Sequence, residues 1–138
     1  MTVKEWLNRS WKLEQEINAL IEAQQRALDM AACVSVCYDR EKIQQQSKGP
    51  ENAMIFYADY SRMIDERIDK LVKLKQEIIE VINCIGDEMQ RAILIERYIN
   101  HKKWEKISVE LHCDLRWLYR LHGKALLKIK STKGVDEL

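Results

Sequence analysis

The chain has 138 residues, of which 46% are hydrophobic and 33% are charged, with four Gly and one Pro. This composition is too apolar for a disordered chain and too rich in Glu, Lys, Leu, Ile and Gln for a β fold, so we expect an all-α protein of one or two small domains. The net charge of +1 hides an uneven distribution, because residues 1–100 hold 14 Lys and Arg against 17 Asp and Glu, whereas residues 101–133 hold nine against three. This asymmetry predicts that a polyanionic partner meets the C-terminal segment.

The first 37 residues predict one long amphipathic helix. Thr2 and Glu5 have the spacing of a capping box, and no Gly or Pro interrupts the chain up to Cys37. Apolar residues recur every seven positions, at Trp6, Leu13 and Leu20.

A second long helix is expected from about Asn52 to Ile85, after a polar loop at about residues 39–52 that holds the only Pro. Two long amphipathic helices joined by one loop are expected to fold back as an antiparallel hairpin. We assign residues 1–86 to this hairpin, as an oligomerisation or partner-binding region. The apolar residues that repeat every seven positions in the second helix are Ile64, Leu71, Ile78 and Ile85.

Shorter helical patterns follow at residues 88–99, from Lys103 to Leu111 and from Leu115 to about Lys130. A tight turn separates the last two, and Asp114 can cap the final helix. Helix, tight turn and helix is the helix-turn-helix arrangement, and the preceding helix can close a three-helix core. We assign residues 87–131 to this module and residues 132–138 to a flexible tail.

The final helix has the composition of a recognition helix. Arg, polar and aromatic side chains near its N-terminal end can reach base edges in the major groove of double-stranded DNA, and lysines around it can contact phosphates. The candidates for base reading are Leu115, Arg116, Trp117, Tyr119 and Arg120. The candidates for phosphate contact are Lys102, Lys103, Lys106, Lys124, Lys128 and Lys130.

The segment RAILIERYINHKKWEKISVELHCDLRWLYRLHGKALLKI at residues 91–129 resembles region 4 of sigma-70-type factors. The stretches MTVKEWLNRSWKLEQEINAL, YADYSRMIDERID and RLHGKAL extend the likeness, and the whole chain is similar to phage-encoded ArpU- and RinA-like late transcriptional regulators of Gram-positive bacteria. The resemblance implies a long helical part before a sigma-like module, and a role in switching on late phage genes. It also implies that residues just after the cap of the last helix read bases. Asp114 departs from the pattern, because Ser is usual there.

For the remaining groups of reactive residues, we expect structural roles and not chemical ones. Cys33 and Cys37 share a helix face, but Cys84 is expected to lie far away, so we expect no metal site and no cofactor. His112, Cys113 and Asp114 are sequence neighbours that rarely point at one another, so we expect no catalytic residue and no enzyme. For His122, packing or solvent exposure is favoured over a phosphate contact. Gly123, in a helix interior, suggests a close approach of its backbone to a neighbour or to DNA.

The sequence leaves several functions open. The first is a sequence-specific, DNA-binding transcriptional regulator of phage or prophage genes. The alternatives are a small-terminase-like phage DNA-packaging protein and an RNA polymerase-binding adaptor without DNA specificity of its own. We expect a homodimer through residues 3–85. No apolar run reaches about 18 residues and no signal-peptide core is present, so we expect a cytoplasmic protein of the bacterial host with no membrane contact.

Overall fold

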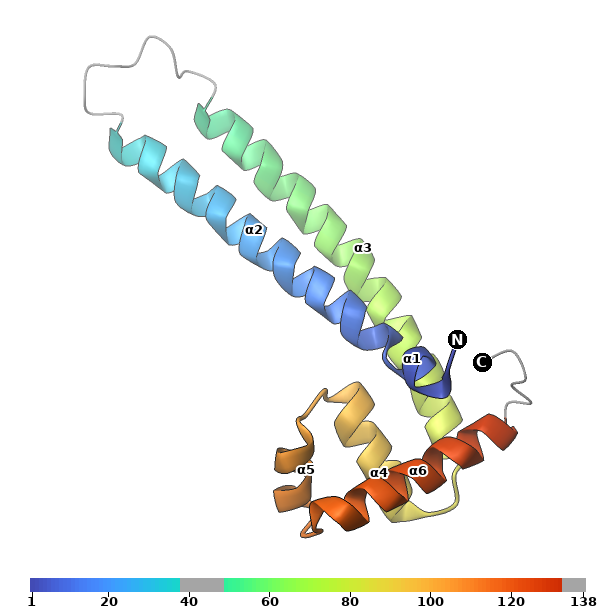
Figure 1. The fold of residues 1–138 in the computed structure, drawn as a ribbon. Coiled ribbons are helices and arrows are strands. Elements are labelled where there is room, and N and C mark those ends of the chain that lie inside the picture. The colour runs from blue at the N-terminus through green and yellow to red at the C-terminus, as the bar shows by residue number, and fades with distance from the viewer. Residues whose placement is uncertain (38–48, 133–138) are drawn as a thin grey trace. The chain divides into compact units, whose positions relative to one another are not determined.

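The structure is a computed structural model that describes residues 1–37 and 49–132 (Figure 1). Every regular element in these residues is helical, which confirms the expected all-α class. The elements are α1 (Val3–Leu7), α2 (Arg9–Cys37), α3 (Gly49–Asn83), α4 (Glu88–Leu94), the π-helical turn η2 (Ile95–Ile99), α5 (Trp104–Glu110) and α6 (Leu115–Thr132). The expected loop lies largely outside the described residues, as does almost all of the expected tail.

The first helix is interrupted, where the sequence predicted one continuous helix. The capping box of Thr2 and Glu5 forms as expected and starts α1. The chain then breaks at Asn8, before α2. The side chain of Arg9 donates from Nε to the carbonyl oxygen of Trp6 at 3.1 Å. In a continuous helix that carbonyl would bond the amide four residues on, so at the break the Arg9 side chain provides it with a partner.

The other helix ends also differ from expectation in places. α3 begins at Gly49, three residues before the expected Asn52, and Pro50 lies in its first turn, where a missing N–H costs nothing. The expected helix 88–99 is divided into α4 and η2, because the amide of Asn100 bonds the carbonyl of Ile95 five residues back.

The chain forms two compact units, and each is described by itself. One unit contains Met1–Leu13 and the chain from Leu71 onward, and the other contains Glu14–Lys70. The first unit combines residues from both ends of the chain, because apolar residues there share one core.

That shared core joins α1, the last turns of α3, α4, η2 and α6. Trp6 and Leu7 of α1 are buried in it with Ala125 and Ile129 of α6. The remaining buried members are Ile78, Val81, Ile82, Ile85, Leu94 and Tyr98. The first residues of the chain therefore support the helix that carries most of the candidate site residues.

A second, smaller core lies beside it between α4, α5 and α6. Ile93, Ile107, Leu118 and Leu121 are its buried members, and Trp104 and Leu111 pack against them. This core fixes the short α5 against α6.

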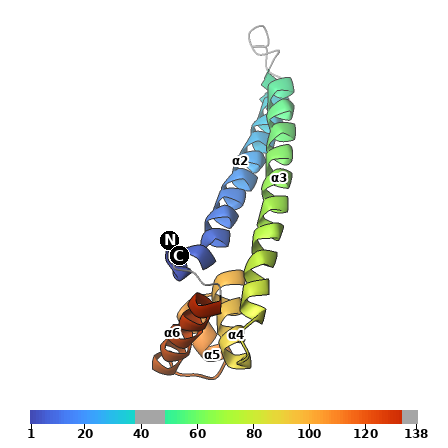
Figure 2. The same cartoon turned by 90° about the vertical axis from the view of Figure 1, so that its right-hand side faces the viewer.

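In the other unit, α2 and α3 run in opposite directions side by side (Figures 1 and 2). The Arg67 guanidinium donates to Glu16 at 2.9 Å, and Gln24 donates to the carbonyl of Tyr57 at 3.3 Å. The residue that is later in α2 has the partner that is earlier in α3, as antiparallel helices require.

Leu118 and Leu127 offer a matched test of this packing on one helix. Leu118 is fully buried, whereas Leu127 is 69% exposed. We expect Leu118→Ala to lower the free energy of unfolding by about 2–5 kcal/mol, because it removes buried methyl groups and leaves a cavity. Leu127→Ala is expected to change it by less than about 0.5 kcal/mol. Urea unfolding followed by far-ultraviolet circular dichroism measures both, and equal effects would contradict this packing.

Candidate nucleic-acid interface

The corner between α5 and α6 is closed by local hydrogen bonds. The Asp114 carboxylate accepts from the amide of Trp117 at 2.7 Å, so Asp114 caps α6 as predicted. Ser108 donates from its hydroxyl to the carbonyl of Cys113, and the amide of Cys113 donates back to the carbonyl of Ser108 at 3.1 Å. His112 has a φ of 54°, a left-handed conformation that lets the chain turn within a few residues.

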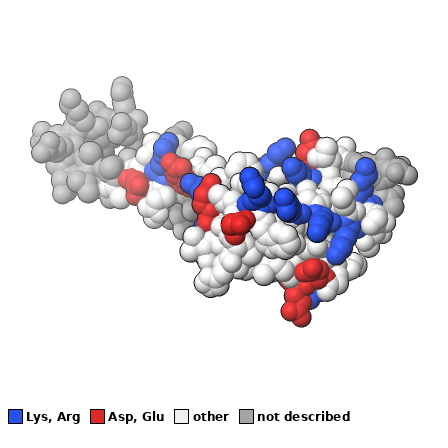
Figure 3. Space-filling view, turned by 60° about the horizontal axis from the view of Figure 1, so that its bottom comes forward, with Lys and Arg blue, Asp and Glu red and all other residues white. Residues whose placement is uncertain are grey.

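α6 has one buried and one exposed face. Its buried face supplies residues to both cores, and its exposed face carries arginine and lysine. Figure 3 shows Lys and Arg gathered in a band across the part of the surface where α6 lies. The exposed basic residues of α6 are Arg116, Arg120, Lys124, Lys128 and Lys130.

The five base-reading candidates all lie on exposed positions of α6, but two of them have other contacts. Tyr119 packs edge-on against Trp104 of α5, with ring centroids 5.4 Å apart. Trp117 lies below the Lys124 ammonium, which is 6.0 Å from the ring centroid. Arg116 and Arg120 are thus the candidates whose charge is presented without an aromatic contact in the described structure.

Lys102 differs from the other phosphate candidates. Its ammonium bonds the Glu110 carboxylate at 2.7 Å and also pairs with Glu96. These two carboxylates raise the pKa of Lys102, and the lysine in turn lowers the pKa of Glu110. Because its charge is already paired, Lys102 ties α5 to η2 and is a poorer phosphate ligand than the exposed Lys103 and Lys106.

A buried polar cluster supports α6 from behind. The Tyr98 hydroxyl oxygen lies 2.6 Å from Nε2 of His122, and the His122 ring packs edge-on against Trp104 at 4.7 Å. The guanidinium of Arg97 covers Trp104 at 4.7 Å. The sequence favoured packing or solvent for His122, and the structure buries it. The sequence did not indicate that Tyr98 and Arg97 are its neighbours.

This cluster shifts two pKa values. Burial lowers the pKa of His122 to about 4, with smaller contributions from the charges of Lys4 and Arg97. Burial also raises the pKa of Tyr98 to about 12, although Arg97 opposes that shift. At neutral pH the pair is therefore an uncharged hydrogen bond between a phenol and an imidazole.

Gly123 lies on the exposed face of α6. A β-carbon added there would meet no atom within 4 Å, so Gly123 does not serve a close contact with a neighbouring helix in the described structure. Of the two roles that the sequence suggested, only a close approach of DNA is left as a hypothesis.

Among the side chains that the structure describes, no three of His, Cys, Asp or Glu are grouped so that they could hold a metal ion. Cys84 and Cys113 are free thiols. None of the described helices is both long and apolar enough to cross a membrane.

Comparison of the chain with protein-family models, with curated proteins and with solved structures finds no match.

The buried His122 predicts a pH dependence of stability. Its pKa is about 4 in the folded protein, against 6.5 ordinarily, so between these values the unfolded chain binds a proton that the folded protein excludes. The contribution of His122 to the free energy of unfolding is therefore fully present above about pH 6.5. It is lost as the pH drops towards 4, and the loss is on the order of 2 kcal/mol. Urea unfolding at about pH 7 and about pH 5 measures the loss.

His122→Gln keeps a partner for Tyr98 but cannot titrate, so it is expected to flatten this pH dependence. His112→Asn is the control, because His112 is exposed and Asn tolerates a left-handed backbone. A pH dependence that is unchanged in His122→Gln, or flattened equally in His112→Asn, would contradict the assignment.

Proposed function

We propose that this protein is a sequence-specific, double-stranded-DNA-binding transcriptional regulator. The observation that carries the proposal is the division of α6 into two faces: one completes both cores, and the other presents Arg116 and Arg120 at its N-terminal end. Arg at the start of a helix that fits the major groove can bond O6 and N7 of guanine in bidentate fashion. Exposed lysines on both sides suit the phosphate backbone.

We assign α5, the turn and α6 to a helix-turn-helix that enters the major groove with α6. The cap at Asp114 places Leu115, Arg116 and Trp117 in the first turn of the helix, the part that reads bases in this motif. Arg116 and Arg120 are the principal base readers in this proposal. Tyr119 adds a contact whose position depends on Trp104.

The resemblance to phage late regulators supports a proposal about where the protein acts and on which genes. In this proposal the protein acts in the cytoplasm of a bacterial host, on phage or prophage genes that are expressed late. Host RNA polymerase is a further partner that fits this role.

We further propose that the protein is a homodimer through residues 3–85, with α2 and α3 forming a helical hairpin. Apolar side chains on these helices are exposed, among them Ile21, Leu28, Ile68 and Val72. A second copy covering such residues would supply the second helix-turn-helix that a two-half-site operator requires.

Replacing both arginines tests the DNA-reading role. In selection from a random duplex pool at about 150 mM salt, where non-specific phosphate binding is weak, we expect the protein to enrich a motif. Arg116→Ala/Arg120→Ala is expected to lose that enrichment, and its affinity for the selected duplex is expected to fall by a factor of about ten to one hundred per arginine.

Arg26→Ala/Arg62→Ala is the matched control. It removes the same charge at exposed positions of α2 and α3, each of which pairs only with a carboxylate nearby on its own helix in the described structure. Equal losses in both double variants would indicate a non-specific charge effect. No enriched motif with the unaltered protein would favour the polymerase-binding adaptor.

The mass in solution tests the dimer and separates it from a packaging protein. One chain has a mass of 16.4 kDa, so light scattering at micromolar concentration is expected to give twice this value. A mass of one chain would contradict the dimer. A ring of many chains would favour the small-terminase-like alternative.

A further inference from the structure

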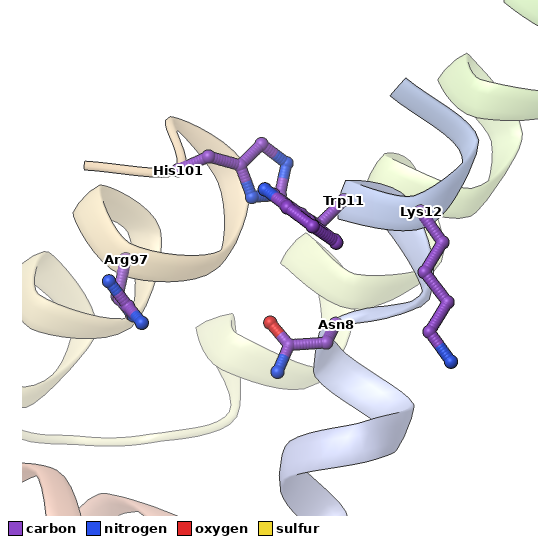
Figure 4. A pocket seen from close by; sticks show the side chains of 5 residues that line it. All are labelled: Asn8, Trp11, Lys12, Arg97 and His101. Atoms are coloured by element: carbon purple, nitrogen blue, oxygen red, sulfur yellow. The ribbon is translucent and has the colours of Figure 1, made fainter. Parts of the chain in front are cut away.

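A cavity of about 280 Å³ lies in the same compact unit as α6, between the α1–α2 junction and the turn after η2. It is lined by Asn8, Trp11, Lys12, Arg97 and His101 (Figure 4). Three of these five side chains are basic types, and none is a carboxylate. Since a water molecule occupies about 30 Å³ in the liquid, the cavity has room for a small organic molecule.

The cavity walls are held by hydrogen bonds that do not need a ligand. The buried Ser10 hydroxyl donates to the carbonyl of Tyr98 at 3.1 Å and lies 3.5 Å from Nε2 of His101. His101 has a φ of 54°, which turns the chain sharply after η2. These contacts fix the start of α2 against the turn, so the cavity is preformed.

Two of the lining groups offer hydrogen-bond donors at the centre of the cavity. Figure 4 shows the Arg97 guanidinium and the Asn8 amide directed towards the space between their helices. Nη1 of Arg97 donates to the carbonyl of Lys102 at 3.0 Å, which holds the guanidinium in place. A guanidinium has five N–H donors, so this bond leaves further donors for a ligand.

Trp11 gives the cavity an apolar side. Its indole is 47% exposed and therefore offers an apolar surface beside the cavity. Trp11 and the exposed Lys12 follow each other on α2, so an apolar surface and a cation lie at the rim.

We propose that this cavity binds a small organic anion, with a carboxylate or phosphate held by Arg97 and Asn8 and a planar or apolar part against Trp11. Lys12 at the rim adds positive charge. Planar guanidinium donors match the oxygens of carboxylate and phosphate, and convergent polar groups beside an aromatic surface are typical of small-molecule sites. Binding of such an anion does not require that α6 reads DNA.

A ligand bound in the cavity would affect the contacts of α6. The guanidinium that faces the ligand also covers Trp104, and Trp104 contacts both Tyr119 and His122 of α6. A ligand that draws Arg97 towards itself changes the contact between Arg97 and Trp104.

The test uses the indole N–H signals of the four tryptophans in nitrogen-15-labelled full-length protein, with the Trp11 signal assigned from Trp11→Phe. Phenyl phosphate and inorganic phosphate are titrated at constant ionic strength. We expect a saturable shift of the Trp11 signal, and tighter binding of phenyl phosphate by about threefold to tenfold, because its ring can pack on the indole.

Lys12→Gln is expected to weaken this binding several-fold. Lys73→Gln, which removes the same charge from an exposed position of α3 in the same compact unit, is expected to leave it unchanged. The proposal is overturned if the Trp11 signal does not saturate, if both phosphates bind equally well, or if the two variants behave alike. A short DNA duplex, added as a competitor, tests whether the cavity binds a free anion or a phosphate of the DNA backbone. Displacement of phenyl phosphate from Trp11 by the duplex would assign the cavity to DNA and overturn the small-ligand proposal.

Discussion

The burial of one face of α6 is the constraint on which the rest of its compact unit depends. The N-terminal half of that face, with Leu118 and Leu121, completes the core with α4 and α5, and the C-terminal half, with Ala125 and Ile129, completes the core with α1 and α3. Because one straight helix serves both cores, its rotation about its own axis is fixed at two points. The same 3.6-residue period then places arginine and lysine on the opposite face. The basic surface is therefore a consequence of apolar packing, and its orientation is as rigid as the cores.

Local features of this fold could be predicted from the sequence because they depend on neighbouring residues. Thr2 and Asp114 cap their helices as expected, since a capping side chain reaches backbone amides only two or three residues away. The break at Asn8 and the π-helical turn at Ile95–Ile99 could not be predicted in this way. At the break the Arg9 side chain bonds a backbone carbonyl, and no spacing pattern encodes such a contact. Periodicity also shows that Trp6 is buried without showing that α6 helps to bury it.

The features of the candidate interface also differ in whether the sequence alone could predict them. The exposure of Arg116 and Arg120 follows from the helix period, and the sequence was sufficient to predict it. The pairing of Lys102 with Glu96 and Glu110 was not predictable, because these carboxylates lie six and eight residues away on either side of a turn. Net charge along a sequence counts such a lysine as available to a partner, whereas in three dimensions its charge is already neutralised. The basic surface is smaller than the nine lysines and arginines of residues 101–133 imply, and it is centred on α6.

The aromatic cluster behind α6 connects two surfaces that the sequence treats as unrelated. Arg97 belongs both to the cavity and to the face of Trp104, and Trp104 touches Tyr119 on the exposed side of α6. Of the base-reading candidates, Tyr119 is the one that shares a ring contact with α5, whereas Arg116 and Arg120 have none in the described structure. A ligand that moves Arg97 is therefore expected to displace Tyr119 before either arginine. Under the proposed function, such a ligand would adjust which bases are preferred and would leave the arginine contacts, and most of the affinity, in place.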